Sequence, residues 1–401
     1  MAPVAVDLFA GAGGLSLGAE MAGVNIVYAN DIFAEAVETY RFNNPDTPVH
    51  QGPIEEVKPA DILATANLQV GELDILLGGP PCQGFSINAP IRTMEDQRNA
   101  LVLEYLRIVE GLRPKYLVIE NVPGLLSLDG GTALETVYER LEALGYHAAH
   151  RVLLASRYGV PQERWRLIIL GQRNDMPPVD FPAPTHNATA KANFTGGSLW
   201  ASVEDHDMSG LPPAVTVAEA IGDLPPLQNG EGHPVIPMPE VSYEKLTFFQ
   251  RWARSGADFI YNHQAQRLGA INLKRLQHIK PGGNWTDIPV DLLPAGMRRA
   301  RRSDHTKRYG RMNPQGQSCT ILTKCDPHWG SFFHYNQDRA VTPREAARLQ
   351  SFPDRYVFQG SLSAQYEQIG NAVPPLLGQA IVSEVVASWT QAQPHLIEER
   401  A

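Results

Sequence analysis

Short apolar runs alternate with helical patterns along the first 171 residues of the chain. Runs rich in Val, Ile and Leu predict buried strands, here at residues 4–10, 25–31, 73–79, 116–122, 147–155 and 166–171. Apolar positions with helical spacing between these runs predict helices at 14–22, 33–42, 98–112 and 132–144. This alternation predicts an α/β fold with a mostly parallel sheet covered by helices on both faces.

The last two expected strands depart from that alternation. Only the segment SRYGVPQERW separates them, whereas a parallel crossover needs a dozen or more residues. We therefore expect an antiparallel hairpin at the end of the sheet. From about residue 175 to 240 the chain becomes rich in Pro, Gly, Ser, Asn and Asp, which predicts loop-rich structure.

Composition narrows the class of protein. No apolar run approaches the roughly 18 residues of a membrane helix, and the first residues lack the pattern of a signal or transit peptide. The three cysteines are too few for a disulfide framework, which favours a reducing, intracellular compartment.

Charge is distributed unevenly. The whole chain has a formal net charge of −9, but residues 251–311 hold 13 Lys and Arg against 4 Asp and Glu. Such a segment fits a positive face for a phosphate backbone and equally fits a solvated helix or loop surface.

The segment DLFAGAGGLSLG (7–18) runs from an expected strand through a glycine turn into an expected helix. Gly11, Gly13 and Gly14 allow a tight turn and a close approach of the backbone to a ligand. Asp31 ends the next strand, where a carboxylate can accept hydrogen bonds from ribose hydroxyls. The pattern indicates an adenosine-type ligand or a structural turn, and it does not distinguish a dinucleotide from S-adenosylmethionine.

Three further segments carry candidate catalytic residues. In GGPPCQGFS (78–86), Cys82 follows a strand at the sheet edge where ligands bind. The alternative is a buried small hydrophobic residue. Glu120 ends a very apolar strand at the same edge, although a carboxylate there can also be a solvated strand end. In PQERWR, Arg164 and Arg166 can point one way and hold a carbonyl oxygen and a phosphate, or form surface ion pairs.

These segments together resemble the DNA (cytosine-5) methyltransferases, and two C-terminal segments agree. RAVTPREAARLQSFPD (339–354) is similar to the family's helix that braces the target-recognition domain, and QYEQIGNAVPPLLG (365–378) is similar to its final motif. The resemblance covers roughly residues 4–175 and 310–385. It implies a Rossmann-like S-adenosylmethionine-dependent methyltransferase fold plus a smaller, loop-rich target-recognition domain.

The resemblance also implies roles for residues. Cys82 would attack carbon 6 of cytosine, Glu120 would engage ring nitrogen 3 and the exocyclic amine, and Arg164 and Arg166 would anchor the flipped base and its backbone. The cofactor site would be lined by Phe9, Gly11, Gly13, Gly14, Leu15, Asp31, Ile32, Ile54, Pro80, Leu101, Asn371 and Val373. DNA would be faced by Gln83, Ser86, Asn88, Arg98 and Thr320.

One position departs from the family pattern. The family usually has Asp-Ile where this chain has Pro53 and Ile54, so the acceptor for the adenine amine is not identified. Cys319, Cys325 and His328 lack a fourth ligand and match no usual zinc spacing, so no metal is expected.

The expected organisation is a catalytic domain at 1–180, completed by 361–401, and a target-recognition domain at 181–360. The expected enzyme methylates carbon 5 of cytosine in a specific double-stranded DNA sequence, resembles the modification partner of a bacterial restriction system, and acts as a cytoplasmic, nucleoid-associated monomer. A tRNA cytosine-5 methyltransferase and a catalytically inactive DNA-binding regulator are the alternatives, and a nicotinamide oxidoreductase shares only the glycine turn.

Overall fold

A computed structural model describes residues 2–81, 100–189, 207–301, 303 and 306–398. The chain divides into two compact units. The first unit comprises Met1–Tyr158, Trp165–Leu211 and Val373–Ala401, and the second comprises Gly159–Arg164 and Pro212–Ala372.

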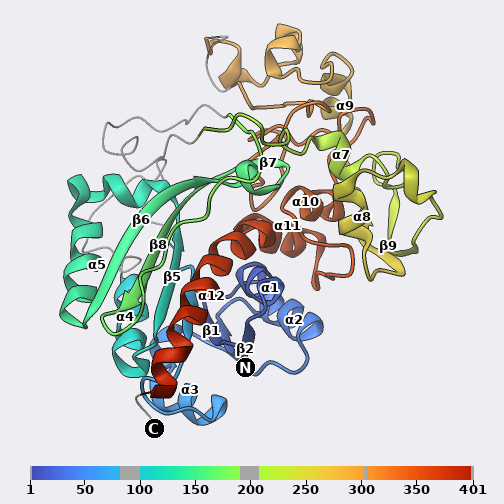
Figure 1. Ribbon diagram of the computed structural model, residues 1–401. Helices are drawn as coiled ribbons and strands as arrows, with labels where there is room; N and C mark the ends of the chain where they lie inside the picture. Colours follow the sequence, from blue (N-terminus) through green and yellow to red (C-terminus); the bar gives the residue numbers. More distant parts are fainter. Residues whose placement is uncertain (1, 82–99, 190–206, 302, 304–305, 399–401) are drawn as a thin grey trace. The chain divides into compact units, whose positions relative to one another are not determined.

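The first unit is built on a seven-stranded sheet in the order β3-β2-β1-β4-β5-β8-β6 (Figure 1). Strands β1 to β5 pair in parallel, whereas β8 lies antiparallel between β5 and β6. The expected antiparallel hairpin is therefore confirmed, as is the mostly parallel sheet. The strands are β1 (Val4–Leu8), β2 (Asn25–Asp31), β3 (Val49–Gln51), β4 (Ile75–Gly78), β5 (Tyr116–Asn121), β6 (Tyr146–Leu154) and β8 (Trp165–Arg173).

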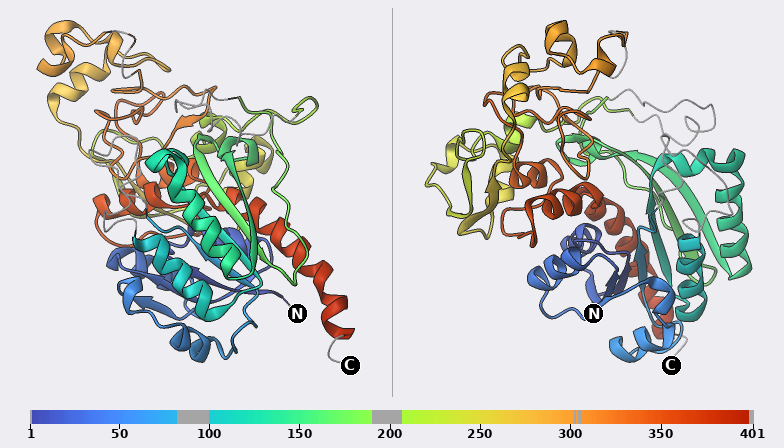
Figure 2. Two further views of the ribbon diagram at one scale, coloured as in Figure 1. Left: turned by 90° about the vertical axis from the view of Figure 1, so that its left-hand side faces the viewer. Right: turned by 180° about the vertical axis from the view of Figure 1, so that it is seen from behind.

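Helices cover both faces of this sheet. Figure 2 shows α4 and α5 on one face and α1 and α12 on the other. The helices of the first unit are α1 (Gly14–Met21), α2 (Ala34–Asn43), α3 (Pro59–Ala66), α4 (Ala100–Leu112), α5 (Thr132–Ala143) and α12 (Pro375–Glu398), with 3₁₀ segments η1 (Ile54–Glu56), η3 (Pro123–Gly131) and η4 (Ala155–Tyr158). Strand β3 and helix α3 were not expected from the pattern of apolar positions.

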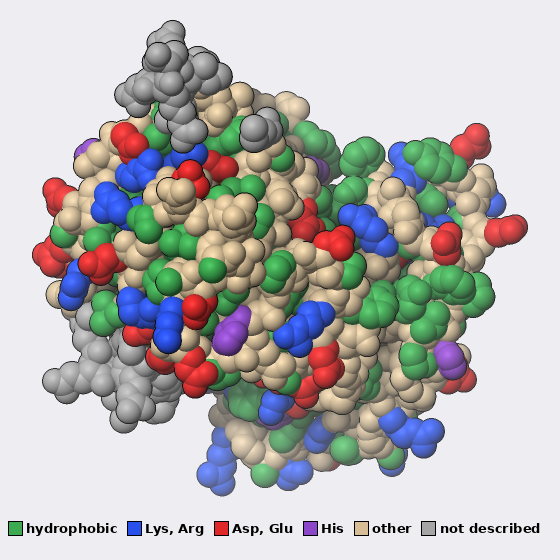
Figure 3. Space-filling model, turned by 90° about the horizontal axis from the view of Figure 1, so that it is seen from below, with side chains coloured by type: hydrophobic (Ala, Val, Ile, Leu, Met, Phe, Trp, Pro, Cys, Tyr) green, Lys and Arg blue, Asp and Glu red, His purple; other side chains and the backbone are tan. Residues whose placement is uncertain are grey.

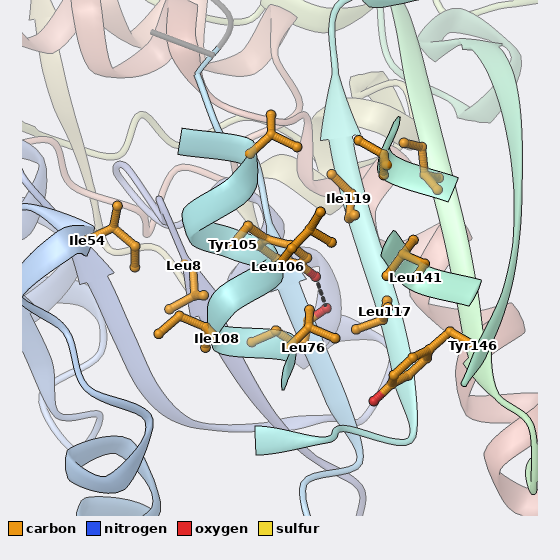
Figure 4. Packing of buried hydrophobic residues seen from close by; sticks show 14 of the residues in the cluster. Leu8, Ile54, Leu76, Tyr105, Leu106, Ile108, Leu117, Ile119, Leu141 and Tyr146 are labelled. Atoms are coloured by element: carbon orange, nitrogen blue, oxygen red, sulfur yellow. Dashed lines mark hydrogen bonds between the residues drawn. The ribbon is translucent and has the colours of Figure 1, made fainter. Parts of the chain in front are cut away.

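The main core lies between the sheet and helices α3, α4 and α5 (Figure 4). Because side chains alternate along a strand, Val6 and Leu8 of β1 and Leu117 and Ile119 of β5 point into this layer. The hydroxyl of Tyr105 on α4 donates to the carbonyl of Leu76 on β4 at 3.0 Å. This bond satisfies a polar group in the core, so the large ring is buried without an unpaired hydroxyl.

Helix α12 begins shortly after the last residue of the second unit and packs on α1 of the first unit. Gly18 makes this close approach possible, since a Cβ there would lie 2.6 Å from the carbonyl oxygen of Pro375 and 2.7 Å from the amide nitrogen of Gln379. The side-chain amide of Gln379 donates to the Met21 carbonyl at 3.2 Å. The indole of Trp389 donates to Asp74 at 2.7 Å. These contacts attach the last helix to α1 and to Asp74, the residue before β4.

One helical stretch, Leu362–Gln393, is long and apolar enough to cross a membrane by length and composition, which the apolar runs of the sequence did not indicate. Its most apolar 18-residue window has a mean hydropathy of 1.2, and 61% of that window is buried inside the structure. A core helix meets the same criterion, and the packing of α12 on α1 accounts for the apolar composition.

The second unit consists of short elements joined by long loops. Its strands are β7 (Gln162–Glu163), β9 (Gly232–Pro237), β10 (Phe259–Gln264) and β11 (Ser318–Cys319). Its helices are α7 (Val217–Ile221), α8 (Phe248–Arg254), α9 (Ala270–Leu276), α10 (Pro343–Leu349) and α11 (Leu362–Asn371), with 3₁₀ segments η5 (Tyr243–Lys245), η6 (Trp285–Asp287), η7 (Val290–Leu292) and η8 (Ala295–Met297). Strands β9 and β10 pair antiparallel, and β7 pairs in parallel with β11.

Buried ion pairs hold α10 in the second unit. Arg339 donates to both carboxylate oxygens of Glu345, at 2.8 and 2.6 Å. Arg348 does the same with Asp354, at 2.9 and 2.6 Å. All four side chains are fully or almost fully buried. Burial alone would raise the pKa of Glu345, but the charge and hydrogen bonds of Arg339, with a smaller effect from His334, hold it well below its usual range. Such bidentate pairs add geometric specificity to the attraction between the charges, so they also fix the orientation of the helix.

Charges of both signs share the molecular surface. Figure 3 shows Lys and Arg side chains interspersed with Asp and Glu side chains on the face that it presents. The basic side chains of that face therefore do not form an uninterrupted positive patch.

Candidate active site

The glycine turn connects β1 to α1 in an unusual backbone conformation. Phe9, Gly11 and Gly13 all have positive φ, at 57°, 55° and 85°. A side chain at Gly11 would meet nothing within 4 Å, so its surroundings are open and the conformation itself favours glycine. Gly13 is the residue before α1, and Gly14 and Leu15 begin the helix and are buried. The turn presents its backbone to open space at the N-terminus of α1.

Asp31 ends β2 and bonds to this turn. One carboxylate oxygen accepts from the amide of Gly11 at 2.7 Å, and the other accepts from the amide of Phe33 at 2.8 Å. Burial raises the pKa of the Asp31 carboxyl, and the backbone donors oppose that rise. Ile32, the next residue, is 67% exposed. The structure thus brings together the glycine turn, a carboxylate and an exposed apolar side chain.

Asp7 is a buried carboxyl group beneath the turn that the sequence reasoning missed. It accepts a hydrogen bond from the hydroxyl of Ser16 at 2.6 Å, and that hydroxyl also bonds to the Tyr40 hydroxyl at 2.8 Å. Burial raises the pKa of Asp7 to about 7, with the nearby Asp31 adding to the rise. One aspartate inside the apolar run VAVDLFA was the available signal.

Arg107, a second residue that the sequence did not single out, holds the segment around Ile54. The Arg107 guanidinium on α4 donates to the carbonyls of Ile54 and Val57, at 2.9 and 3.0 Å. Arg107 thus fixes the backbone at both ends of this short 3₁₀ segment. Ile54 is almost fully buried, and Leu101 is partly buried against the same core.

Strands β4 and β5 bring the candidate catalytic segments to one edge of the sheet. They pair in parallel, with Gly78 opposite Ile119, so Pro80 and Glu120 both follow at their carboxyl ends. The side-chain amide of Asn121 donates to the Pro80 carbonyl at 3.3 Å. Asn121 is buried and fixes the backbone ahead of the expected nucleophile. The expected site residues Cys82, Gln83, Ser86, Asn88 and Arg98 lie outside the described residues.

Glu120 and Arg166 form an ion pair at this edge. Their register is set by the antiparallel pairing of β5 with β8, in which Glu120 lies opposite Ile168. The Arg166 Nε lies 2.6 Å from a carboxylate oxygen of Glu120, and both side chains are 12% exposed. Burial lowers the pKa of the Arg166 guanidinium, and Glu120 opposes that shift. A Cβ at Gly79 would lie 3.4 Å from the other Glu120 oxygen, so glycine leaves that side of the carboxylate open.

Arg164 has a different environment within the second unit. Its side chain is almost fully buried, and it donates to the carbonyls of Ile321, Gly370 and Ala372 at 3.3, 2.9 and 3.1 Å. These bonds connect the 159–164 segment to Ile321, two residues after β11, and to the C-terminal end of α11. The structure therefore places Arg166 beside Glu120, whereas Arg164 bonds to backbone carbonyls of the second unit.

Two buried glutamines extend the Arg164 contacts and were not expected. Gln162 accepts from the Ile321 amide at 2.9 Å, and its amide donates to the Leu349 carbonyl at 3.1 Å and to the side-chain oxygen of Gln350. Gln350 in turn donates to the Ala372 carbonyl at 2.6 Å. Because these partners are up to 188 residues apart in sequence, no local pattern could have revealed them.

Comparison with known proteins identifies the family. Residues 4–387 match the family model described as C-5 cytosine-specific DNA methylase. The chain belongs to this family. It is 36% identical to the type II methyltransferase M.AgeI of Thalassovita gelatinovora, over 95% of this chain and 98% of that protein. It is 32% identical to the type II methyltransferase M.DdeI of Desulfomicrobium norvegicum, over 98% and 90% of the two chains.

Solved structures agree at the level of the fold. A protein from E. coli, described as a prophage-encoded DNA modification methyltransferase, superimposes with a TM-score of 0.70 at 22% identity, covering 97% of this chain and all of that one. A DNMT2 mutant of Spodoptera frugiperda gives 0.56 at 17% identity, covering 97% and 100%. The expected methyltransferase fold is thus confirmed. The chain is a cytosine-5 DNA methyltransferase, homologous to modification methyltransferases of type II restriction–modification systems.

The remaining predicted site residues of this cytosine-5 methyltransferase lie in two places. Thr320, after β11, donates its hydroxyl to the Glu163 carbonyl at 2.8 Å. Asn371 ends α11 and is exposed, and Val373 is buried at the start of the first unit's last segment. Asn371 and Val373 flank Ala372, whose carbonyl accepts from both Arg164 and Gln350.

The cysteines of the second unit are buried thiols. Burial raises the pKa of both the Cys319 and the Cys325 thiol, which favours the protonated form over the thiolate that binds metals. Among the residues that the structure describes, no group of three or more His, Cys, Asp or Glu side chains is arranged to hold a metal ion.

Proposed function

We propose that this methyltransferase modifies carbon 5 of one cytosine within a specific double-stranded DNA sequence, using S-adenosylmethionine, with Cys82 as the nucleophile. The observation that carries the proposal is the Glu120–Arg166 pair at the carboxyl edge of the sheet. The backbone of Pro80, tied there by Asn121, leads directly into Cys82. A carboxylate and a guanidinium at this edge, with a cysteine two residues after Pro80 in the sequence, supply the groups that a flipped cytosine requires.

The chemistry assigns a separate task to each of these groups. Carbon 5 of cytosine is a poor nucleophile until the Cys82 thiolate forms a bond to carbon 6. Glu120 hydrogen bonds to the exocyclic amine and to a proton at ring nitrogen 3, which makes the ring electron-poor and favours that addition. Arg166 keeps the carboxylate in place and binds the carbonyl oxygen of the base. Carbon 5 would then take the methyl group that bound S-adenosylmethionine supplies, and loss of the carbon-5 proton to a base, with departure of the Cys82 thiolate, would restore the aromatic ring.

The first unit fits S-adenosylmethionine through its glycine turn. The backbone at Gly11 faces open space, and the Asp31 carboxylate lies beside it. Phe9, Gly13, Gly14, Leu15, Ile32, Ile54, Pro80, Leu101, Asn371 and Val373 are proposed to complete the cofactor site. When bound, the cofactor supplies an electrophilic methyl group. Asp31 would accept from its ribose hydroxyls, and Ile32 would cover its adenine.

DNA is proposed to bind both the target-recognition domain at 181–360 and the segment that follows the expected nucleophile. A base stacked in a duplex cannot present carbon 6 to a thiol, so the target cytosine must be flipped out, at a cost of a few kcal/mol. Gln83, Ser86, Asn88, Arg98 and Thr320 are proposed to face DNA, and Arg164 to support the loop that carries Arg166.

The cellular role that fits this function is the modification half of a bacterial restriction system, acting on the nucleoid in the cytoplasm as a monomer and without a metal. The type II methyltransferases to which the chain is similar support that role. A tRNA cytosine-5 methyltransferase remains the second candidate.

Bisulfite sequencing of DNA from cells that express the protein tests the proposal. We expect 5-methylcytosine at one position of one recurring sequence, and none in cells expressing Cys82→Ala. The purified protein should methylate duplex DNA and not tRNA in parallel assays. Methylation of tRNA alone, or a Cys82→Ala protein that still methylates DNA, would contradict the proposal.

A further inference from the structure

An exposed tryptophan in the second unit has an arginine over its ring. The guanidinium carbon of Arg308 lies 4.6 Å from the centre of the Trp329 ring. Trp329 is 57% exposed, although a side chain of this size is usually buried. Both residues lie outside the set already assigned to the cofactor or to the cytosine.

Two further aromatic rings, His328 and Tyr309, pack next to the Arg308–Trp329 pair. His328 meets Trp329 edge-on at 4.8 Å and Tyr309 edge-on at 5.2 Å. The Tyr309 hydroxyl bonds to Nδ1 of His328 at 2.7 Å, and the Tyr309 ring is buried in a core that includes Trp285. Burial and the Arg308 charge lower the pKa of His328, so the ring is neutral near pH 7.

Backbone hydrogen bonds fix the loop that presents Trp329. The Trp329 amide donates to the Asp326 carbonyl at 2.9 Å, and the His328 amide donates to the Asp326 carboxylate at 2.9 Å. The Tyr309 amide donates to the Pro327 carbonyl at 2.6 Å. An exposed indole held this firmly loses little conformational entropy on binding a partner, which is typical of a recognition residue.

The guanidinium has its donors available. Within the described part of the chain, no group accepts a hydrogen bond from the Arg308 side chain. A guanidinium that packs over an indole keeps its N–H groups, which lie in the guanidinium plane, available to a partner. Lys307 beside it pairs with Glu163 at 3.1 Å. The Arg308 guanidinium is therefore a positive charge held over the Trp329 ring, and its N–H donors make no hydrogen bond within the described residues.

The partner that fits this geometry is the enzyme's DNA substrate. The segment 297–330 contains eight Lys and Arg against two Asp and Glu, so anionic DNA is attracted to it. A planar guanidinium with two parallel donors matches O6 and N7 of guanine in the major groove. It also matches a phosphate, but a phosphate contact needs no stacking partner to fix the plane of the arginine.

We infer that Arg308, held flat by Trp329, reads one guanine of the recognition sequence by a bidentate contact to O6 and N7. This inference rests on the proposed function, because it assumes a specific duplex target. It makes Arg308 a specificity-determining residue and Trp329 a positioning residue. A good bidentate contact corresponds to roughly a 5- to 150-fold preference over the wrong base.

The test begins with the sequence context that the wild-type enzyme methylates. Arg308→Gln should lower the preference for guanine at one position by about 5- to 150-fold, while the rest of the context persists. Arg308→Lys should lower the same preference by a smaller factor, because an ammonium group can still donate to guanine. Trp329→Ala should relax the same position, and Trp329→Phe should retain most of the preference because a ring remains. The context is independent of the amount of folded protein, so partial loss of stability does not obscure it.

Base analogues provide a measurement on the unaltered enzyme. Replacing that guanine by 7-deazaguanine removes N7 but keeps base pairing, and we expect slower methylation by wild type and no further slowing in Arg308→Gln. Arg299→Gln, an exposed arginine in the same basic segment, should weaken binding without altering the context, as a phosphate contact does.

Three results would overturn the inference. The first is that the Arg308 variants methylate the same sequence context as wild type. The second is that these variants methylate all sequences more slowly by the same factor, with a smaller salt dependence. The third is that wild type methylates DNA at an unchanged rate when any guanine of the site is replaced by 7-deazaguanine. Each of them leaves DNA methylation by wild type intact, so the proposed function would survive. If wild type methylates no duplex DNA, the proposed function itself fails.

Discussion

The buried carboxyl of Asp7 makes the stability of the first unit depend on pH in a direction that can be worked out. Its pKa in the folded protein is about 7, against 3.8 for an unperturbed aspartate, mainly because it is buried. Replacing Asp7 by Asn keeps an oxygen that can accept from the Ser16 hydroxyl and removes the titration. The substitution therefore isolates the effect of the charge.

The sign and the size follow from proton linkage. Between pH 4 and pH 7 the folded state holds a proton that the unfolded chain has released, so rising pH favours unfolding. The full difference of about three pKa units corresponds to about 4 kcal/mol, and roughly 2.5 kcal/mol of it falls between pH 5 and pH 8. Stability from this group is complete below pH 4 and absent above pH 7.

Urea unfolding of wild type and Asp7→Asn at several pH values measures this directly. Titrating groups that do not interact with Asp7 are common to both proteins, so they cancel in the difference between the two free energies of unfolding. We expect Asp7→Asn to gain about 2.5 kcal/mol relative to wild type from pH 5 to pH 8. A difference that stays constant over that range, or one that changes in favour of wild type, would refute the reasoning.

Three further substitutions test other parts of the structure. Gly18→Ala should destabilise the protein by about 1–3 kcal/mol in denaturant unfolding, because its Cβ would lie 2.6 Å from the backbone of α12. Gly269→Ala is the control, and it should change the stability little because the space around Gly269 is open. Glu120→Gln should lower methyl transfer by about 100-fold or more and lower the melting temperature, because Arg166 loses its charged partner; normal turnover would contradict this. Arg164→Lys should cost about 2–3 kcal/mol of stability through lost hydrogen bonds to backbone carbonyls, and an unchanged unfolding midpoint would count against that role.

The sequence predicted those parts of the fold in which local pattern and tertiary environment agree. The apolar runs at 4–10, 25–31 and 116–122 became buried strands because helices cover both faces of the sheet. The short segment between the last two strands left an antiparallel hairpin as the only geometry. Strand β3 and helix α3 were missed because three residues, VHQ, and eight residues, PADILATA, are too short to display a clear period.

The sequence predicted those site residues whose positions are set by where the strands end. Glu120 and Arg166 were expected at one edge, and the structure pairs them there. The alternation of Arg164 and Arg166 about Trp165 suggested that both point toward a ligand. Arg164 lies just before β8, however, and its carbonyl partners come from segments distant in sequence. Contacts of this kind depend on tertiary packing, which local periodicity does not encode.

The most direct test of the central claim is a covalent complex between the protein and DNA containing 5-fluorocytosine at the methylated position. Fluorine at carbon 5 cannot leave as a proton does, so the thiolate remains attached to carbon 6. With S-adenosylmethionine present, we predict a DNA-linked protein whose modified peptide contains Cys82, and no such product from Cys82→Ala. Attachment through another residue, or an equal yield from Cys82→Ala, would contradict the account.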